Sequence, residues 1–388
     1  MSRIWIIAGV AAVCLVVGIV LSHRIEPGIR VEKIMLATNT PALRIYPATP
    51  GPHPIALLAH GNGGSKEMLF RYAEALAAAG FDCYSVDEAG FGESPLPVSL
   101  TNIDFNFQEA ERALGAVDVF IGHSMGGGVG GWSVLKAGFH PKLFIGVGAP
   151  VKLGKQGPPL LLMGGQFEEF FRPAQLRART DAQVVIGPWS DHMTELYDPV
   201  LVNAAVTAAC AAVGKPVPAA PTAWHWRFAG VVLGMAGALG LMFYLPELHP
   251  RLARIRLLIV PGVLLLAMIL TLGPWLGVTS QLRRIPAHLI VLGVVWLALV
   301  GLGKQRMPRW SLPMVTGILA LGCMAVGFSI HGFLFMVIGC ALAISTLLLL
   351  PAVAVGRIAT RGGSRRDGDI AMAIFASYVI GQFMPLFY

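Results

Sequence analysis

The 388-residue sequence predicts an α/β domain with a mostly parallel sheet, joined to an all-helical membrane region. Strand-like and helix-like segments alternate between residues 30 and 213, which is the pattern of βαβ units. Long apolar runs follow this part. Only 13% of the residues are charged and the mean hydropathy is +0.68, whereas soluble domains carry about a quarter charged residues. The composition therefore indicates a membrane protein.

The expected sheet consists of strand-like runs of five residues each, separated by helical or turn-rich segments. A helical pattern over 67–80 lies between the first two runs. Strands that alternate with helices form parallel sheets that are buried on both faces. The candidate strands are 55–59, 82–86, 117–121, 143–147, 160–164 and 183–187.

The N-terminal run over 4–21 is uncharged and has the minimum length for a helix that spans a membrane. A cleaved signal peptide is the competing interpretation, and AAVC at 11–14 is a weak match to a lipoprotein signal. The run ends in Ile-Val-Leu-Ser-His-Arg, without the small residues of a cleavage site. We therefore predict an uncleaved transmembrane anchor.

A second membrane region is expected at 224–388, after a Pro- and Ala-rich linker at 214–223. Acidic residues are rare there, and Glu247, Asp367 and Asp369 are expected in loops. Ion pathways need ionisable groups, so an anchor, a lipid-facing scaffold or a partner surface is favoured over an ion-coupled transporter, while a hydrophobic lipid pathway stays open. The six predicted spans are 227–245, 256–278, 286–303, 312–329, 332–356 and 369–387.

The net charge of +8 is unevenly distributed along the chain. Residues 22–223 hold 15 Lys and Arg against 18 Asp and Glu, and residues 224–388 hold 13 against 3. The cations lie in short segments between apolar runs, as in cytoplasmic membrane loops, and not on a face that would bind nucleic acid. Their alternation along the chain predicts an integral protein of a bacterial inner (plasma) membrane. Its N-terminus is expected in the cytoplasm and the α/β domain outside it.

The five cysteines show no metal-binding spacing. The sequence indicates neither a metal nor an organic cofactor. A single Cys83–Cys210 disulfide stays open as an alternative to two free thiols.

The segment DVFIGHSMGGGVGG at 118–131 contains the pattern G-x-S-x-G, with Ser124 between Gly122 and Gly126. It stands between a strand pattern and a helix pattern. At such a sharp turn a serine hydroxyl is exposed as a nucleophile, and only small residues fit two positions before and after it. The N–H of Met125, at the start of the helix, is then placed to stabilise an oxyanion. A glycine-rich helix start with an idle serine is the alternative.

These residues resemble the α/β-hydrolase fold family, over about residues 30–213. LLAHGNGG at 57–64 is similar to the family's HG stretch, which implies Gly61 or Asn62 as the second oxyanion donor. DEAGFGES at 87–94 resembles its D-x-x-G-x-G-x-S turn. WSDHMTE at 189–195 follows the last strand pattern, where the family carries its catalytic histidine. The resemblance implies His192 as the general base, and His60 and His123 as structural residues.

The acid of the implied triad is expected after the strand at 160–164, commonly as G-x-x-D. Glu168 is in register with that pattern, with glutamate in place of aspartate, which the fold accepts. Glu169 is the alternative one residue later. Asp191 is a third choice, poorly placed beside His192 and more suited to bracing the loop.

The segment at 148–159 is too short for a large lid, so an open site is expected. Phe105, Phe107 and Phe167 are either acyl-pocket residues or ordinary core and surface aromatics. The resemblance implies a serine hydrolase that cleaves an ester or thioester of a small-molecule or lipid-like acyl substrate. The apolar runs and the charge distribution add the expectation that it is membrane-bound, with membrane lipids as its surroundings and no nucleic acid partner. The alternatives are an acyltransferase with the same triad, and a non-enzymatic binding, scaffold or transport-associated protein.

Overall fold

The computed structural model describes residues 3–136, 138–154, 156–244, 285–330, 333–361 and 364–381, and scattered positions between 248 and 271. The chain divides into two compact units. Ile25–Trp224 form an α/β domain, and Met1–Arg24 with the segments after His225 form a unit of apolar helices. Each unit is described by itself.

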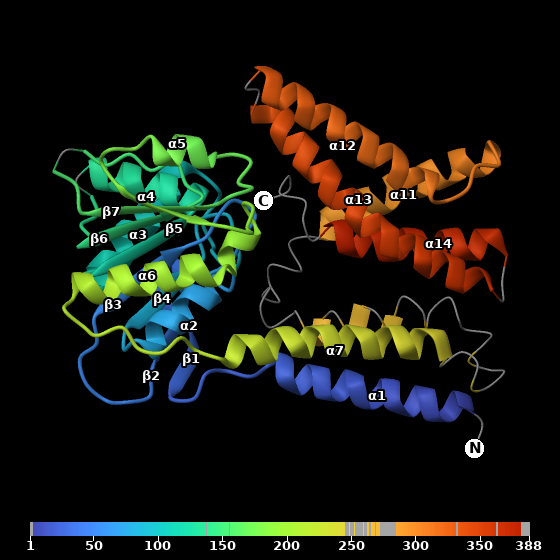
Figure 1. Cartoon of the computed structure of the whole chain (residues 1–388), viewed down its shortest axis with the longest axis horizontal. Coiled ribbons are helices and arrows are strands. Elements are labelled where there is room, and N and C mark those ends of the chain that lie inside the picture. The colour runs from blue at the N-terminus through green and yellow to red at the C-terminus, as the bar shows by residue number, and fades with distance from the viewer. Residues whose placement is uncertain are drawn as a thin grey trace. The chain divides into compact units, whose positions relative to one another are not determined.

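The α/β domain is built on an eight-stranded sheet with the order β1-β2-β4-β3-β5-β6-β7-β8 (Figure 1). The strands β4, β3, β5, β6, β7 and β8 run parallel to one another. β1 pairs antiparallel with β2, and β2 pairs antiparallel with β4. The bounds are β1 Ile29–Ala37, β2 Thr40–Pro47, β3 Ile55–Ala59, β4 Asp82–Val86, β5 Val119–His123, β6 Leu143–Val147, β7 Leu160–Gly165 and β8 Gln183–Gly187.

The predicted strands are therefore present, with small shifts at their ends. The strand expected at 117–121 runs over Val119–His123, because Gly122 and His123 pair with Gly146 and Val147 of β6. The antiparallel β1 and β2 were missed by the sequence prediction. Charged residues interrupt both strands, and only alternate positions of β1 face the core, so their apolar pattern is weak.

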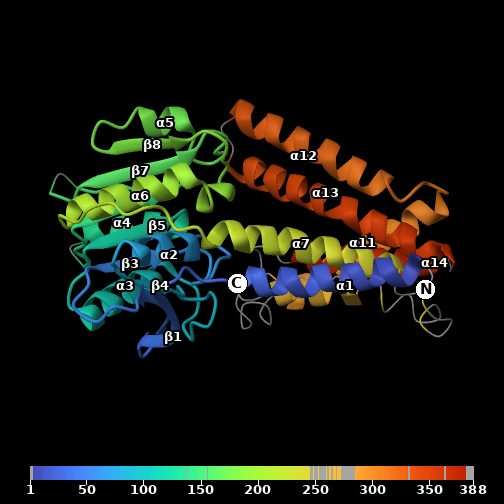
Figure 2. The same ribbon diagram turned by 60° about the horizontal axis from the view of Figure 1, so that its bottom comes forward.

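Helices cover both faces of the sheet, with β1 and β8 at its two ends (Figure 2). α2 and α6 contact each other and pack on one face, and α3, α4 and α5 lie on the other. Ser99 caps α3 by accepting the Asn102 N–H, and Asp198 caps α6 by accepting the Val200 N–H. The bounds are α2 Phe70–Ala78, α3 Leu100–Leu114, α4 Met125–Leu135, α5 Pro173–Arg177 and α6 Pro199–Ala212.

Two features of the domain test predictions made from the sequence, one on the lid and one on a disulfide. The connection from β6 to β7 shows neither helix nor strand in its described residues, as expected for a chain with a minimal lid. Cys83 and Cys210 are both free and buried, so the alternative of a disulfide between them was wrong.

The second unit consists of long apolar helices. Within the part of the chain that the structure describes, two segments, Arg3–Ser22 and Ala223–Met242, have the length and composition of a helix that crosses a membrane. The predicted span at 256–278 lies mostly outside the described residues. The bounds are α1 Arg3–Ser22, α7 Ala223–Tyr244, α11 Ile285–Lys304, α12 Ser311–Ile330, α13 Phe333–Thr360 and α14 Arg365–Gly381.

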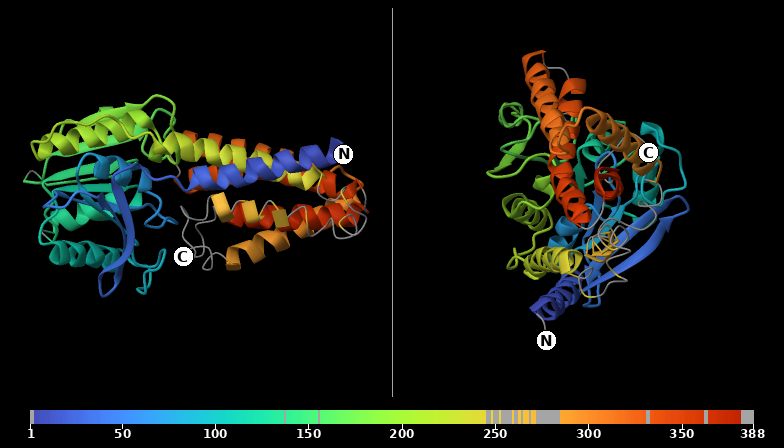
Figure 3. Two further views of the ribbon diagram at one scale, coloured as in Figure 1. Left: turned by 90° about the horizontal axis from the view of Figure 1, so that it is seen from below. Right: turned by 90° about the vertical axis from the view of Figure 1, so that its right-hand side faces the viewer.

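α1 and α7 lie side by side and antiparallel (Figure 3). A Cβ atom on Gly18 would lie 2.3 Å from the Gly234 nitrogen, and one on Gly230 would lie 2.5 Å from the Ser22 nitrogen. The missing side chains let the two backbones touch, which is how apolar helices associate within a bilayer.

One expectation for the helical unit is corrected. Asp367 and Asp369 lie within α14, which begins at Arg365, and not in a loop. Asp369 forms an ion pair with Arg309, which precedes α12. The pairing of the two charges allows the helix to start earlier than the apolar run.

Candidate active site

Ser124 occupies the sharp turn between β5 and α4. Its backbone has φ +50° and ψ −115°, and only Arg306 shares a positive φ among the described non-glycine residues. Such a conformation costs about 1–3 kcal/mol and is held by its surroundings. The Ser124 N–H donates to the Val147 carbonyl at 2.9 Å, and the Gly126 N–H donates to the His60 carbonyl at 3.1 Å. The turn keeps the partly exposed Ser124 side chain at the carboxyl edge of the parallel strands.

The glycines on either side of Ser124 are required by close backbone contacts. A Cβ atom on Gly122 would lie 2.4 Å from the Gly127 Cα, and one on Gly126 would lie 2.5 Å from the His60 oxygen. Since real Cβ atoms do not approach backbone this closely, any side chain at either position would push the turn apart. The spacing that drew attention to Ser124 in the sequence is thus a requirement of this turn.

His192 lies in the loop after β8 and faces Ser124. Its Nε2 is 3.1 Å from the Ser124 Oγ. The ring is 9% exposed and is held by an edge-to-face contact with Phe170, whose centroid is 4.8 Å away. The hydrogen bond and the confined ring give the arrangement that a serine needs in order to transfer its proton to a base.

Glu168 holds the other side of the His192 ring. Its Oε2 lies 2.8 Å from the His192 Nδ1, and its Oε1 accepts the N–H groups of Phe170 at 2.8 Å and Phe171 at 3.0 Å. Burial alone would raise the pKa of this carboxyl. The hydrogen bonds from His192 and the two amides outweigh burial, so the pKa lies below its ordinary value. A carboxylate that accepts several hydrogen bonds in this way stays charged at neutral pH.

The alternative acids have other contacts. Glu169 accepts the backbone N–H of His192 at 3.2 Å and does not bond the ring. Asp191 accepts the N–H groups of Met193 at 3.0 Å and Thr194 at 2.8 Å, which braces the loop. Of the three acids proposed from the sequence, the structure therefore brings Glu168 to the imidazole.

Glu195 is a fourth acidic residue at the site, and the sequence analysis gave it no role. It lies in the 3₁₀ turn Thr194–Leu196 and is fully buried. Its Oε2 accepts the Gly165 N–H at 3.1 Å, and its Oε1 lies 3.7 Å from the His192 Nδ1. Burial and the adjacent charge of Glu168 raise its pKa well above the ordinary value, so the protonated acid is favoured. Only its position three residues after His192 could have indicated it.

His60 and His123 are buried beside the turn. His60 contacts backbone groups, whereas His123 contacts a backbone carbonyl and also the Glu195 Oε1, 3.3 Å from its Nε2. His60 Nδ1 lies 2.8 Å from the Gly61 oxygen, and its Nε2 accepts the Glu88 N–H at 3.1 Å. His123 Nε2 lies 3.1 Å from the His192 carbonyl oxygen. Burial lowers the pKa of both rings, that of His123 to about 3, so both are neutral spacers.

The residues expected to bind an oxyanion surround Ser124. Met125 follows it as the first residue of α4. A Cβ atom on Gly61 would lie 3.1 Å from the Ser124 Cβ, so the loop after β3 passes directly beside the serine. Asn62 is the next, exposed residue of that loop.

A group of possible metal ligands overlaps the site. His123, His192 and Glu195 bring one ligand atom each within 4.8 Å of one another. Both ring nitrogens of His192 are, however, within hydrogen-bond distance of Ser124 and Glu168. Metal binding through His192 would break one of these contacts, so the geometry favours acid–base chemistry.

Residues 54–144 match the family model described as the alpha/beta hydrolase fold. The match covers β3 to β5, the Ser124 turn and α4, and the sheet around it is mostly parallel. The domain has the α/β-hydrolase fold. No curated protein matches the sequence significantly.

Solved hydrolase structures resemble the hydrolase domain. A dienelactone hydrolase from Anabaena variabilis is 18% identical, with a TM-score of 0.38, covering 49% of this chain and 99% of that one. A thermophilic esterase from Thermogutta terrifontis is 17% identical, with a TM-score of 0.37, covering 46% and 97%. A hydrolase from Pseudomonas aeruginosa PA01 is 15% identical, with a TM-score of 0.37, covering 48% and 99%.

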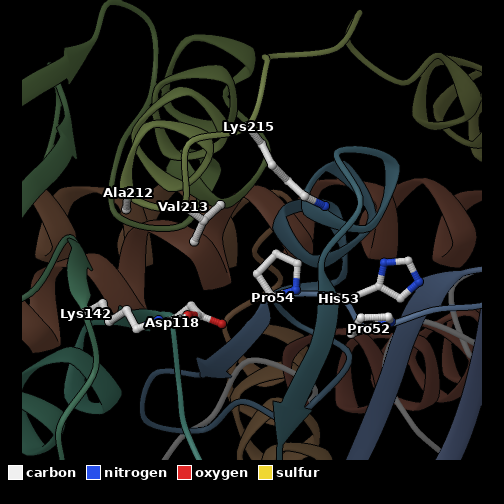
Figure 4. A pocket seen from close by; sticks show the side chains of 8 residues that line it. All are labelled: Pro52, His53, Pro54, Asp118, Lys142, Ala212, Val213 and Lys215. Atoms are coloured by element: carbon white, nitrogen blue, oxygen red, sulfur yellow. Dashed lines mark ion pairs between the residues drawn. The ribbon is translucent and has the colours of Figure 1, made fainter.

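A hollow of about 530 Å³ opens at the edge of the hydrolase domain where the parallel strands begin, opposite to Ser124 (Figure 4). It is lined by Pro54, Asp118 and Lys142, which directly precede β3, β5 and β6, and by the end of α6. Lys142 pairs with Asp118 at 2.7 Å, which neutralises both charges. This hollow lies away from Ser124 and adds no reactive group.

The three phenylalanines considered for an acyl pocket are separated. Phe107 is fully buried in the core against Phe120 and Phe139, so its ordinary structural role applies. Phe105 is 40% exposed on α3. Phe167 is 59% exposed beside Glu168, in the loop after β7.

Proposed function

We propose that the protein is a membrane-bound serine hydrolase that cleaves an ester or thioester through an acyl-enzyme. The continuous contact from Ser124 to His192 to Glu168, with distances of 3.1 Å and 2.8 Å, carries this proposal. The α/β-hydrolase fold of the domain and the family match across Ser124 support it.

In the proposed reaction the Ser124 Oγ attacks the acyl carbonyl while His192 accepts the hydroxyl proton. Glu168 keeps the Nδ1–H tautomer of His192 and stabilises the imidazolium without taking a proton. The N–H of Met125 and that of Gly61 or Asn62 bind the oxyanion. The leaving alcohol or thiol takes the proton from His192. Water, activated by the same ring, then hydrolyses the ester on Ser124 and releases the acid.

The membrane attachment is proposed from the helical unit. Arg3–Ser22 has the length and composition of a span, and its valines at positions 10, 13, 16 and 20 are each more than half exposed. Apolar side chains in such numbers are stable on a surface only when lipid or a partner covers them. Together with the membrane attachment we propose the orientation predicted from the sequence, in which the hydrolase domain lies outside the cytoplasm.

Trapping of the acyl-enzyme tests the function. Full-length protein in detergent is mixed with p-nitrophenyl esters and acyl thioesters of increasing chain length, quenched in acid and digested. An acyl adduct on the peptide that contains Ser124, absent in Ser124→Ala, is expected. Turnover without an adduct on that peptide in any rapidly quenched sample would refute the mechanism.

A further inference from the structure

The two chain segments that join the hydrolase domain to the apolar helices leave the domain at one place. Glu26, four residues after the end of α1, accepts the N–H groups of Thr222 at 2.8 Å and Ala223 at 2.7 Å. The N–H of Glu26 donates to the Glu74 carboxylate in α2 at 3.1 Å. Because α7 begins at Ala223, both connections converge on α2.

That place is on the catalytic edge of the domain, by which we mean the carboxyl edge of the parallel strands, where Ser124 lies. The Arg71 guanidinium, in the first turn of α2, lies 4.6 Å from the centre of the Trp224 ring. The adjacent Tyr72 donates its hydroxyl hydrogen to the Glu195 carbonyl at 3.0 Å. Glu195 belongs to the loop that carries His192, so the connections and the catalytic loop share one end of α2.

The linker after α6 returns the chain to this edge. α6 ends at Ala212, beside the hollow at the opposite edge. Lys215 donates to the Gly80 carbonyl just beyond the far end of α2, at 2.9 Å. Val217–Pro221 then line a hollow together with Ala75 of α2 and with Asn203, Val206 and Thr207 of α6. An extended chain covers about 3 Å per residue, so the ten linker residues cross the domain before α7 begins.

The loops at the catalytic edge expose large apolar side chains beside His192. We call Phe167, Trp189 and Tyr197 the aromatic rim, with exposed fractions of 59%, 85% and 56%; Met193 in the same loop is 40% exposed. The Phe167 N–H donates to the Ser190 carbonyl at 2.9 Å, which joins the loops after β7 and β8. Trp and Tyr side chains are favoured at the interface between a bilayer and water.

We propose that the catalytic edge faces the bilayer, that the aromatic rim enters its interfacial layer, and that the substrate is the acyl ester or thioester of a lipid resident in that bilayer. The naming of the substrate rests on the proposed function. The physical argument is that both chain segments leave the hydrolase domain at this edge, within a few residues of the proposed spans α1 and α7. An ester that extends from a lipid headgroup then reaches Ser124 from the side on which the rim lies.

The depth of the rim in lipid tests the orientation without any enzymatic readout. The full chain, with its five native cysteines replaced by alanine, receives a single cysteine at Trp189 or, as a matched control, at Leu135. Leu135 is 49% exposed and ends α4 at the opposite edge. Each cysteine carries an environment-sensitive fluorophore, and the protein is placed in phosphatidylcholine nanodiscs that contain lipid spin-labelled near the headgroup.

We expect quenching by the spin label at position 189 to exceed quenching at position 135 at least threefold, with emission at shorter wavelength. Equal quenching at the two positions would overturn the orientation. Labelling of Ser124 by a fluorophosphonate in the same samples separates the two proposals. Absence of labelling would refute the proposed function, whereas labelling together with a solvent-exposed position 189 would refute the membrane-facing edge alone.

The substrate class is tested by comparing two fluorophosphonates in nanodiscs, one with a long alkyl chain and one with a short, water-soluble chain. In Phe167→Ala/Trp189→Ala the ratio of the two labelling rates should fall about tenfold, because the rim no longer positions the site at the lipid. Leu135→Ala should keep the ratio of the unmodified chain. An unchanged ratio in the double variant would contradict a lipid substrate that enters past the rim.

Discussion

Oε1 of Glu195 lies 3.7 Å from Nδ1 of His192, next to the 2.8 Å contact that Glu168 makes with the same nitrogen. Two buried carboxyl groups therefore lie near the same nitrogen of the His192 ring. They cannot both be charged cheaply, because the negative charge of one carboxylate disfavours ionisation of the other and so raises its pKa. The raised pKa of Glu195 and the lowered pKa of Glu168 show how the site resolves this conflict. The two shifts favour the charge on Glu168 and the proton on Glu195.

The stability of the domain should therefore depend on pH through Glu195. Its folded-state pKa lies above the unfolded value, so its stabilising contribution is present below the ordinary carboxyl pKa and is lost as the pH rises through the folded-state pKa. One such proton changes the free energy of unfolding by at most about 1.4 kcal/mol per pH unit. Glu195→Gln should remove this slope.

Denaturant unfolding of the full chain in detergent, at pH values from 4 to 8, measures this effect. The difference between Glu195→Gln and the unmodified chain should grow in favour of the variant as the pH rises. Glu32→Gln, which changes an exposed carboxyl on β1, is the matched control and should follow the unmodified chain. Parallel curves for all three proteins would show that Glu195 is charged in the folded state.

Substitution of the two neighbouring glutamates should separate their roles. Glu168→Gln removes the charge that faces the His192 Nδ1, and kcat for an ester should fall about 10⁴-fold, as expected when a triad acid is replaced by its amide. Glu169→Gln keeps an oxygen that accepts the His192 backbone N–H, so its loss should stay below tenfold. Similar losses in the two variants would contradict the assignment of Glu168.

The turn at Ser124 should not tolerate a methyl group at Gly126. In Gly126→Ala the new Cβ would meet the His60 oxygen at 2.5 Å, and the free energy of unfolding should fall by about 1–3 kcal/mol. Gly128→Ala is the matched control, because its Cβ would meet only the Pro150 side chain at 3.3 Å. Alanine also favours a helix more than glycine does. Equal unfolding midpoints of the two variants would contradict the close packing of this turn.

Much of the catalytic edge could be predicted because its elements are local in sequence. The parallel strands are short runs of mostly apolar residues, and both the G-x-S-x-G turn and the histidine after the last strand lie next to such runs. Glu168 was expected to pair with His192 because it stands at the acidic position of the pattern G-x-x-D after β7. The spacing alone did not distinguish it from Glu169, since the choice depends on which carboxylate the loop turns toward the ring.

The missed features depend on contacts between distant segments. β1 and β2 carry Glu32, Lys33 and Arg44, and they form a hairpin only because β2 joins the edge of the sheet at β4. Glu195 is an ordinary loop residue in the sequence, and its pKa is raised by burial that no short motif reveals. The contacts of Glu26 with Thr222 and Ala223 join residues almost 200 positions apart.

The central claim is that His192 and Glu168 activate Ser124. Labelling of membranes with a fluorescent fluorophosphonate tests it most directly, with the unmodified chain beside Ser124→Ala, His192→Ala and the control Ser133→Ala. The account predicts a labelled band of the full chain that disappears in Ser124→Ala, weakens at least 100-fold in His192→Ala and persists in Ser133→Ala. A folded, unmodified chain that takes up no label, or equal labelling of Ser124→Ala, would contradict it.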